Sequence, residues 1–60
     1  MYSEITKEAF NHLTHDIKSY KTTESELARK TYYQAFGLTC LIIFNYIGSI
    51  EQYYIQDINA

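Results

Sequence analysis

Twenty consecutive residues, 31–50, carry no charged side chain, and this uncharged window limits the possible folds more than any other feature of the chain. Within residues 35–47 apolar side chains would lie nearly all round a helix. One amphipathic neighbour cannot cover a helix that is apolar on every side, so such a helix needs several packing partners or lipid. The apolar positions at heptad-like spacing are Tyr33, Phe36, Cys40, Ile43, Ile47, Ile50 and Tyr54.

The first third of the chain has the spacing of an amphipathic helix over about residues 4–20. Its apolar side chains fall on one side of a helical wheel and its polar ones on the other. Ser3 is the expected N-cap, and Glu4 suits the positive end of the helix dipole. The apolar side comprises Ile5, Ala9, Phe10, Leu13, Ile17 and Tyr20.

A second helix is expected over about residues 24–47, because Thr23 and Glu26 have the spacing of a capping box. Gly48 can end it, and a short third helix or a kinked continuation is expected over about residues 50–58. The resulting prediction is an all-α fold for a single domain of residues 1–60. It consists of an antiparallel helical hairpin with a C-terminal extension that assembles into a helical bundle.

The alternative fold is α+β with a C-terminal β-hairpin. The segment from Thr39 to Ile47 is rich in β-branched and aromatic residues, and Gly48-Ser49 could form a type II′ turn. After Ile50 the alternation of polar and apolar residues is poor, so the helical interpretation is preferred.

The uncharged window also allows a single membrane-spanning helix over about residues 31–50, since twenty helical residues extend about 30 Å. Arg29 and Lys30 before the window would place the N-terminus on the cytoplasmic side. Against this, Gln34 and Asn45 form a polar line on that helix. The N-terminus lacks the pattern of a signal peptide. A cytoplasmic protein is therefore preferred over a membrane subunit.

No catalytic, cofactor-binding or metal-binding residues are predicted. The chain contains no nucleotide-binding fingerprint and no nucleophile–base pattern. Cys40 lies in the most apolar segment, where burial weakens thiol reactivity. Glu8, His12 and His15 could share one helical face and bind a metal, but three ligands on a solvated face are better explained as exposed polar residues. The chain is therefore expected not to be an enzyme.

Basic residues cluster around the expected turn near residue 21 and are weak candidates for phosphate contacts. The net charge of −2 argues against a dedicated nucleic-acid-binding protein, and a minor nucleic-acid accessory role ranks third. The candidates are Lys18, Lys21, Arg29 and Lys30.

Seven tyrosines among 60 residues indicate protein contact surfaces, because tyrosine is enriched at interfaces. A low-GC coding bias would raise the tyrosine and isoleucine content as well. The preferred function is a small interaction module that binds a larger protein or copies of itself, as a stoichiometric inhibitor, adaptor or regulator. Such chains are often encoded by phages or plasmids. The predicted interface residues are Tyr32, Tyr33, Phe36, Ile43, Ile47, Ile50, Tyr53 and Tyr54.

Overall fold

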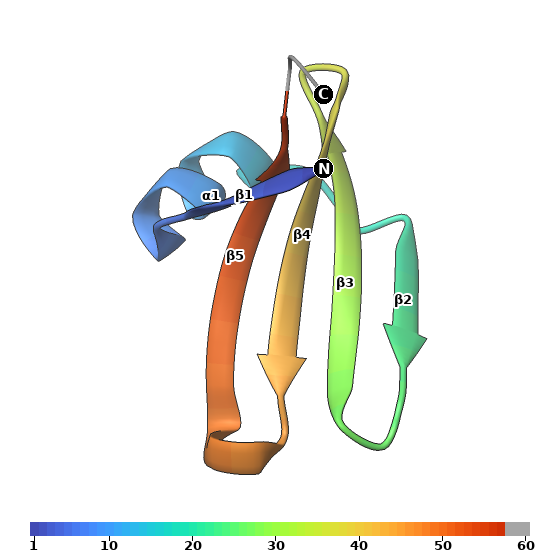
Figure 1. Cartoon of the computed structure of the whole chain (residues 1–60). Coiled ribbons are helices and arrows are strands. Elements are labelled where there is room, and N and C mark those ends of the chain that lie inside the picture. Colours follow the sequence, from blue (N-terminus) through green and yellow to red (C-terminus); the bar gives the residue numbers. More distant parts are fainter. Residues whose placement is uncertain (58–60) are drawn as a thin grey trace.

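The chain forms one five-stranded antiparallel sheet and one short helix in a computed structural model that describes residues 1–57. The strand order across the sheet is β1-β5-β4-β3-β2, so β4 is central and β1 and β2 are the edges (Figure 1). The elements in chain order are β1 (Tyr2–Ile5), α1 (Lys7–Thr14), β2 (Lys21–Glu24), β3 (Ala28–Ala35), β4 (Leu38–Asn45), a 3-10 turn η1 (Ile47–Ser49) and β5 (Ile50–Gln56).

The all-α prediction is wrong. Residues 28–45 of the expected helix over residues 24–47 form β3, β4 and the turn between them, and residues 50–56 of the expected third helix form β5. Residue 58, where that third helix was expected to end, lies outside the described residues. The expected first helix of residues 4–20 shortens to Lys7–Thr14. Residues 1–57 contain no helical hairpin that could build a bundle, whereas the alternative with a C-terminal hairpin agrees with the pairing of β4 and β5.

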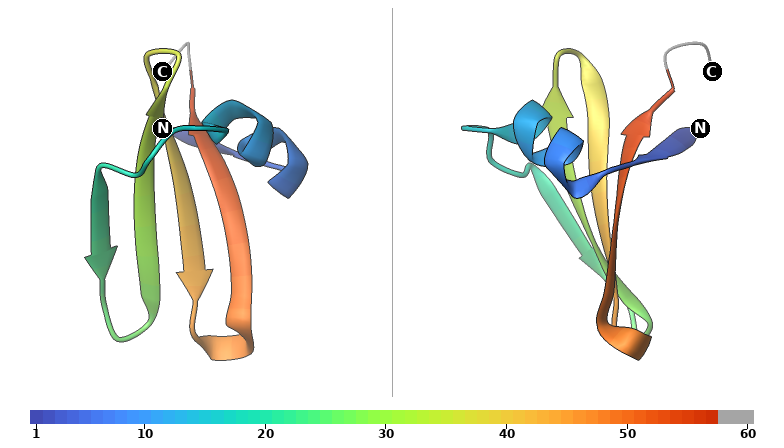
Figure 2. Two further views of the ribbon diagram at one scale, coloured as in Figure 1. Left: turned by 180° about the vertical axis from the view of Figure 1, so that it is seen from behind. Right: turned by 90° about the vertical axis from the view of Figure 1, so that its left-hand side faces the viewer.

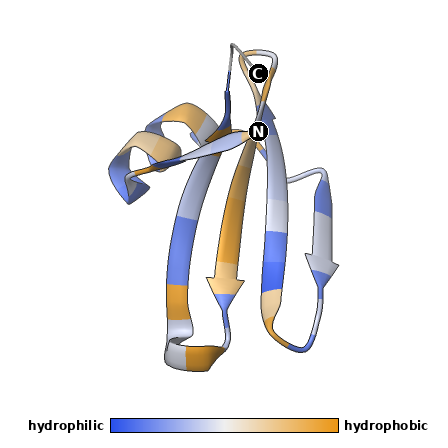
Figure 3. Cartoon of the chain, viewed as in Figure 1, coloured by the Kyte–Doolittle hydropathy of each residue, from blue (hydrophilic) through white to orange (hydrophobic). Residues whose placement is uncertain are grey.

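The central position of β4 explains why both of its faces carry apolar side chains. Cys40 and Ile42 point toward the helix, whereas Leu41 and Ile43 point to the opposite face. A central strand with apolar side chains on both faces has a continuous apolar sequence and lacks the usual alternation. Its β-branched and aromatic residues favour the extended conformation. Figure 3 shows this run as the most hydrophobic strand of the sheet.

The helix begins three residues later than predicted, at Lys7. Thr6 is its N-cap: the Thr6 hydroxyl oxygen accepts a hydrogen bond of 3.1 Å from the backbone N–H of Ala9. Ser3, the expected cap, belongs to β1. The capping box expected from Thr23 to Glu26 does not form. Instead the Ser25 hydroxyl oxygen accepts bonds from the backbone N–H groups of residues 27 and 28 and shapes the β2–β3 turn.

A two-residue loop, Phe36-Gly37, joins β3 to β4. Both residues have positive φ, 54° for Phe36 and 75° for Gly37, as in a type I′ hairpin turn. The β4–β5 connection is longer than the two-residue turn considered from the sequence. It contains Gly48 with a φ of 81° and Ser49 with a φ of 51°. These turns fix the register that places alternate side chains on opposite faces.

The core lies between α1 and one face of the sheet, and Figure 2 shows the helix on that side alone. Phe10 is 1% exposed and packs against Tyr33 and Tyr53, with ring centroids 5.5 Å and 5.3 Å away. Cys40 and Ala35 complete the buried cluster. The eight-residue helix is too short to cover the whole sheet, and the opposite face has no covering element among residues 1–57.

No helix within residues 1–57 has the length and the apolar character needed to cross a membrane. The helical span considered for residues 31–50 does not form, because this segment consists of most of β3, all of β4 and η1.

Candidate functional site

The candidate site is the face of the sheet opposite α1, which we call the open face. Its centre is hollowed, with a volume of about 290 Å³. Side chains from four strands line this hollow, so it depends on the whole sheet and not on a single loop. The lining residues are Tyr2, Lys30, Tyr32, Leu41, Ile43 and Tyr54.

One row of directly paired residues crosses the open face from edge to edge, and we call it the central row. Glu4 on β1 pairs with Tyr54, Tyr54 with Leu41, Leu41 with Tyr32, and Tyr32 with Lys21 on β2. Directly paired residues in an antiparallel sheet project from the same face. The row therefore has an aliphatic centre, a tyrosine on each side of it, and opposite charges at its two ends.

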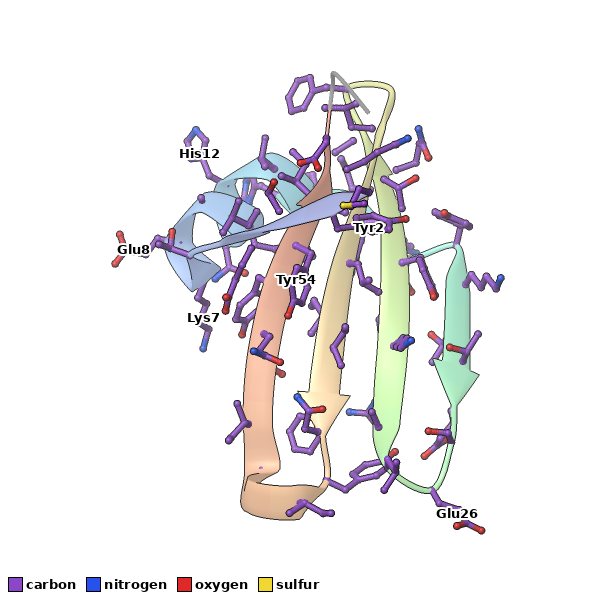
Figure 4. The ribbon with its side chains drawn as sticks, in the orientation of Figure 1. Tyr2, Lys7, Glu8, His12, Glu26 and Tyr54 are labelled. Carbon is purple, nitrogen blue, oxygen red and sulfur yellow. The ribbon has the colours of Figure 1, made fainter. Side chains whose placement is uncertain are left out.

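The floor of the hollow is aliphatic and its walls are aromatic. Leu41 is only 6% exposed although no helix covers it, whereas Ile43, Tyr32 and Tyr54 are half-buried. Figure 4 shows Tyr54 on β5 and Tyr2 on β1 at this part of the sheet, while Glu8 and His12 project from the helix. Rings that surround an aliphatic floor form an amphipathic surface, because each tyrosine also carries a hydroxyl group.

Tyr32 has two close neighbours at the β2 side of the open face. The Tyr20 ring lies 6.4 Å from the Tyr32 ring, and Lys21 Nζ lies 5.4 Å from its centroid. A lysine above an aromatic ring makes a weak attractive contact at an exposed site. These contacts restrict the orientation of Tyr32 before any ligand binds.

Few charges lie on the open face, and they are separated. Lys21 and Lys30 lie on the β2–β3 side, while Glu4 lies on the β1 side. Alternation along β3 turns Arg29 to the helix side, where its guanidinium group lies 5.7 Å from the Phe44 ring centroid. The two halves of the open face therefore carry opposite charge.

The structure divides the eight predicted interface residues among three places. Tyr32, Ile43, Tyr54 and Ile50 belong to the open face, by their alternation and register. Tyr33 and Tyr53 pack against Phe10 beneath the helix, so they are core residues. Phe36 and Ile47 lie in the β3–β4 and β4–β5 turns and are 81% and 78% exposed.

Each pair of adjacent tyrosines is split between the two faces. Tyr32 and Tyr54 project from the open face, and their neighbours Tyr33 and Tyr53 enter the core. Successive side chains of a strand point in opposite directions, so adjacency alone predicts this division once a strand is assumed.

The predicted phosphate-contact residues do not form one cluster. Lys21 and Lys30 share the open face, Arg29 lies on the other face, and Lys18 lies in the connection between α1 and β2. Sequence reasoning missed Tyr2 and Leu41 as parts of the site. No alternation signals the position of Tyr2, because residues 2–5 read apolar, polar, polar, apolar.

Two tyrosines, Tyr53 and Tyr46, and the Cys40 thiol have raised pKa values. Burial, together with a hydrogen bond to Glu51, raises the pKa of Tyr53 to about 12. A hydrogen bond from the Tyr46 hydroxyl to Glu24 raises the pKa of Tyr46, with smaller contributions from desolvation and from the charge of Glu24. Burial raises the pKa of the Cys40 thiol, which makes it a poor nucleophile at neutral pH.

The possible metal ligands of the first helix line a wide, shallow hollow of about 500 Å³ together with Asn11. His15 lies outside α1, and its Nε2 atom is 3.3 Å from a carboxylate oxygen of Asp16. Across residues 1–57, no three His, Cys, Asp or Glu side chains are arranged to hold a metal ion. Glu8, His12 and His15 are all exposed to solvent.

No protein-family model matches the chain, and comparisons with curated proteins and with solved structures give no significant match.

Proposed function

We propose that the chain is a non-enzymatic protein-interaction module, and that its open face is the surface that another polypeptide covers. The observation that carries this proposal is the hollow on the open face, where Leu41 and Ile43 form an aliphatic floor and Tyr2, Tyr32 and Tyr54 form the walls. Interface centres combine aromatic anchors with buried aliphatic groups in this manner. A larger protein that docked there would be affected stoichiometrically, as by an inhibitor, adaptor or regulator.

A polypeptide fits the open face better than a nucleic acid does. Binding to a phosphate backbone depends on several cations, but the open face offers Lys21 and Lys30 and also carries Glu4. The net charge of −2 adds repulsion for a polyanion. The aliphatic floor contributes most when an apolar side chain displaces water from it.

Site-specific photo-crosslinking in the native cells tests the proposal. The full chain would carry a benzophenone amino acid in place of Tyr54, which keeps an aromatic group in the hollow. The matched control carries the same group in place of His12, on the exposed side of α1. We expect polypeptide adducts at position 54 and none at position 12.

Equal adducts at the two positions, or none at position 54, would contradict the proposed function. Mass spectrometry of the adducts identifies the second polypeptide, including the case in which it is another copy of the chain. The cytoplasmic location expected from the sequence is part of the same proposal, and fractionation of the same cells checks it.

A further inference from the structure

Building on the proposed function, we infer that the polypeptide covering the open face is a second copy of this chain, packed face to face about a two-fold axis parallel to the strands. The inference rests on the order of groups along the central row, Glu4-Tyr54-Leu41-Tyr32-Lys21. This order is self-complementary under that one rotation. The product is a β-sandwich in which each copy supplies one sheet and keeps its own helix outside.

The rotation superposes unlike groups at the ends of the row and like groups at its centre. With the axis over β4, Leu41 lies opposite Leu41 of the second copy, and Tyr54 lies opposite Tyr32. Glu4 at the β1 edge then faces Lys21 at the β2 edge of the other copy, and this contact occurs twice. The long lysine side chain can bridge the offset that sheet twist introduces at the edges.

Charge excludes the other way of stacking two copies. A two-fold axis in the same plane but perpendicular to the strands would place Glu4 against Glu4 and Lys21 against Lys21. Like charges in opposed positions are unfavourable. The row therefore selects both the partner and the relative orientation of the two sheets. Because an isologous interface uses the same patch twice, no further surface is required.

The size of the open face is compatible with such a dimer. The molecule measures 30 × 22 × 20 Å, so its largest face offers roughly 600 Å² per copy. Covering that face on both copies buries about 1,200 Å² in total, at the lower end of the range for specific interfaces. We therefore expect a reversible dimer whose population changes with protein concentration.

Charge reversal provides the decisive test, because Glu4 and Lys21 are too far apart to interact within one copy. Four inter-strand steps of about 4.8 Å separate them. By sedimentation equilibrium of the full chain at low salt, we expect Glu4→Lys and Lys21→Glu each to weaken dimerisation roughly tenfold. The double variant should recover most of the lost affinity. Glu8→Lys and Lys7→Glu, on the helix, are controls of equal charge change and should leave the dimer intact.

The orientation is tested by a distance between spin labels. Ile47→Cys places a label on the exposed β4–β5 turn, while buried Cys40 stays unlabelled in the folded protein. With the axis parallel to the strands, the two turns lie at the same end of the sandwich. The label separation should then be below about 25 Å, because packed sheets lie about 10 Å apart. The excluded orientation would put the turns at opposite ends.

Several outcomes would overturn this inference. A protein that stays monomeric at all concentrations would do so. A double variant that loses as much dimer affinity as the two single variants together would also do so, as would a spin-label separation well above 25 Å, roughly the limit set by two packed sheets. Retardation of a labelled oligothymidylate that is lost in Tyr32→Ala would assign the face to nucleic acid instead. If the photo-crosslink at position 54 captures only a different protein, the inference fails but the proposed function stands. If it captures no polypeptide, both fail.

Discussion

Phe10 meets Tyr33 edge-on, with ring planes at 81° and ring centroids 5.5 Å apart, and this contact joins the only α-helix of residues 1–57 to the sheet. Phe10 also contacts Tyr53 on β5. One helical side chain thus bridges two strands that are separated in the sheet by β4. The fold depends on this residue more than on any other of α1.

Phe10→Ala should therefore destabilise the protein by about 3–5 kcal/mol, the range for a fully buried aromatic side chain. A 60-residue domain has a total stability of only about 3–9 kcal/mol, so much of the variant should be unfolded at ambient temperature. Urea unfolding followed by circular dichroism measures the loss. Leu13→Ala, at a half-buried position on the same helix, should cost less. Equal losses for the two variants would contradict the central role of Phe10.

The β3–β4 turn yields a prediction of increased stability. Phe36 adopts a φ of 54° although it is neither glycine nor asparagine, and its ring is 81% exposed. Phe36→Asn gives the Asn-Gly pair that type I′ turns prefer. We expect a gain of about 0.5–1 kcal/mol, since the left-handed conformation costs other residues roughly that amount or more.

Phe36→Ala is the control for this turn, because it removes the ring but keeps the unfavourable backbone conformation. Thermal unfolding of the three proteins compares them. If the Ala variant gains as much as the Asn variant, the effect comes from the exposed ring and not from the backbone.

Deprotonation of Tyr53 should lower the free energy of unfolding at alkaline pH. The folded-state pKa is raised to about 12 by burial and by the bond to Glu51, compared with about 10 for an unfolded tyrosine. Between these values the unfolded chain binds fewer protons than the folded one, so rising pH favours unfolding. The contribution of protonated Tyr53 to the free energy of unfolding is fully present below pH about 10 and is lost as pH rises through about 12.

Tyr53→Phe separates this effect from the titration of lysines. The variant should lose less stability than the natural protein between pH 9 and 11.5, a window set roughly by the two pKa values. Urea midpoints at each pH measure the difference. If the urea midpoints of the two proteins fall equally with pH, Tyr53 does not titrate in this manner.

Part of this architecture can be predicted from the sequence, and part cannot. The amphipathic spacing correctly indicated Phe10 and Leu13 as the buried side of a helix, but β1 and the loop after residue 14 share the same apolar spacing. Short elements of four to eight residues give few periods for any pattern to be recognised. The sequence cannot show that β1 leaves the helix and pairs with β5, because that contact joins the two ends of the chain.

The sequence of the central strand is compatible with a buried helix for a specific physical reason. Residues 40–44 are apolar at successive positions because one face of β4 packs beneath the helix and the other forms the floor of the open-face hollow between the tyrosines. An unbroken apolar run fits a buried helix and a buried strand equally well by periodicity. The β-branched and aromatic composition of residues 39–47 and the adjacent tyrosines favour a strand, and the capping-box pattern at Thr23 is not accompanied by a helix.

The strand assignment of β4 can be tested directly with two neighbouring isoleucines. Ile42 packs against the core beneath the helix, whereas Ile43 lies in the floor of the open-face hollow. Ile42→Asp places a charge in the core and should cost more than about 3 kcal/mol, enough to unfold much of the protein. Ile43→Asp should keep the circular dichroism spectrum of the folded sheet, because its carboxylate can reach water and faces Lys30 across the strand pair. It should instead abolish the concentration-dependent increase in mass. A folded Ile42→Asp variant together with an unfolded Ile43→Asp variant would contradict the assignment of the two faces of the sheet.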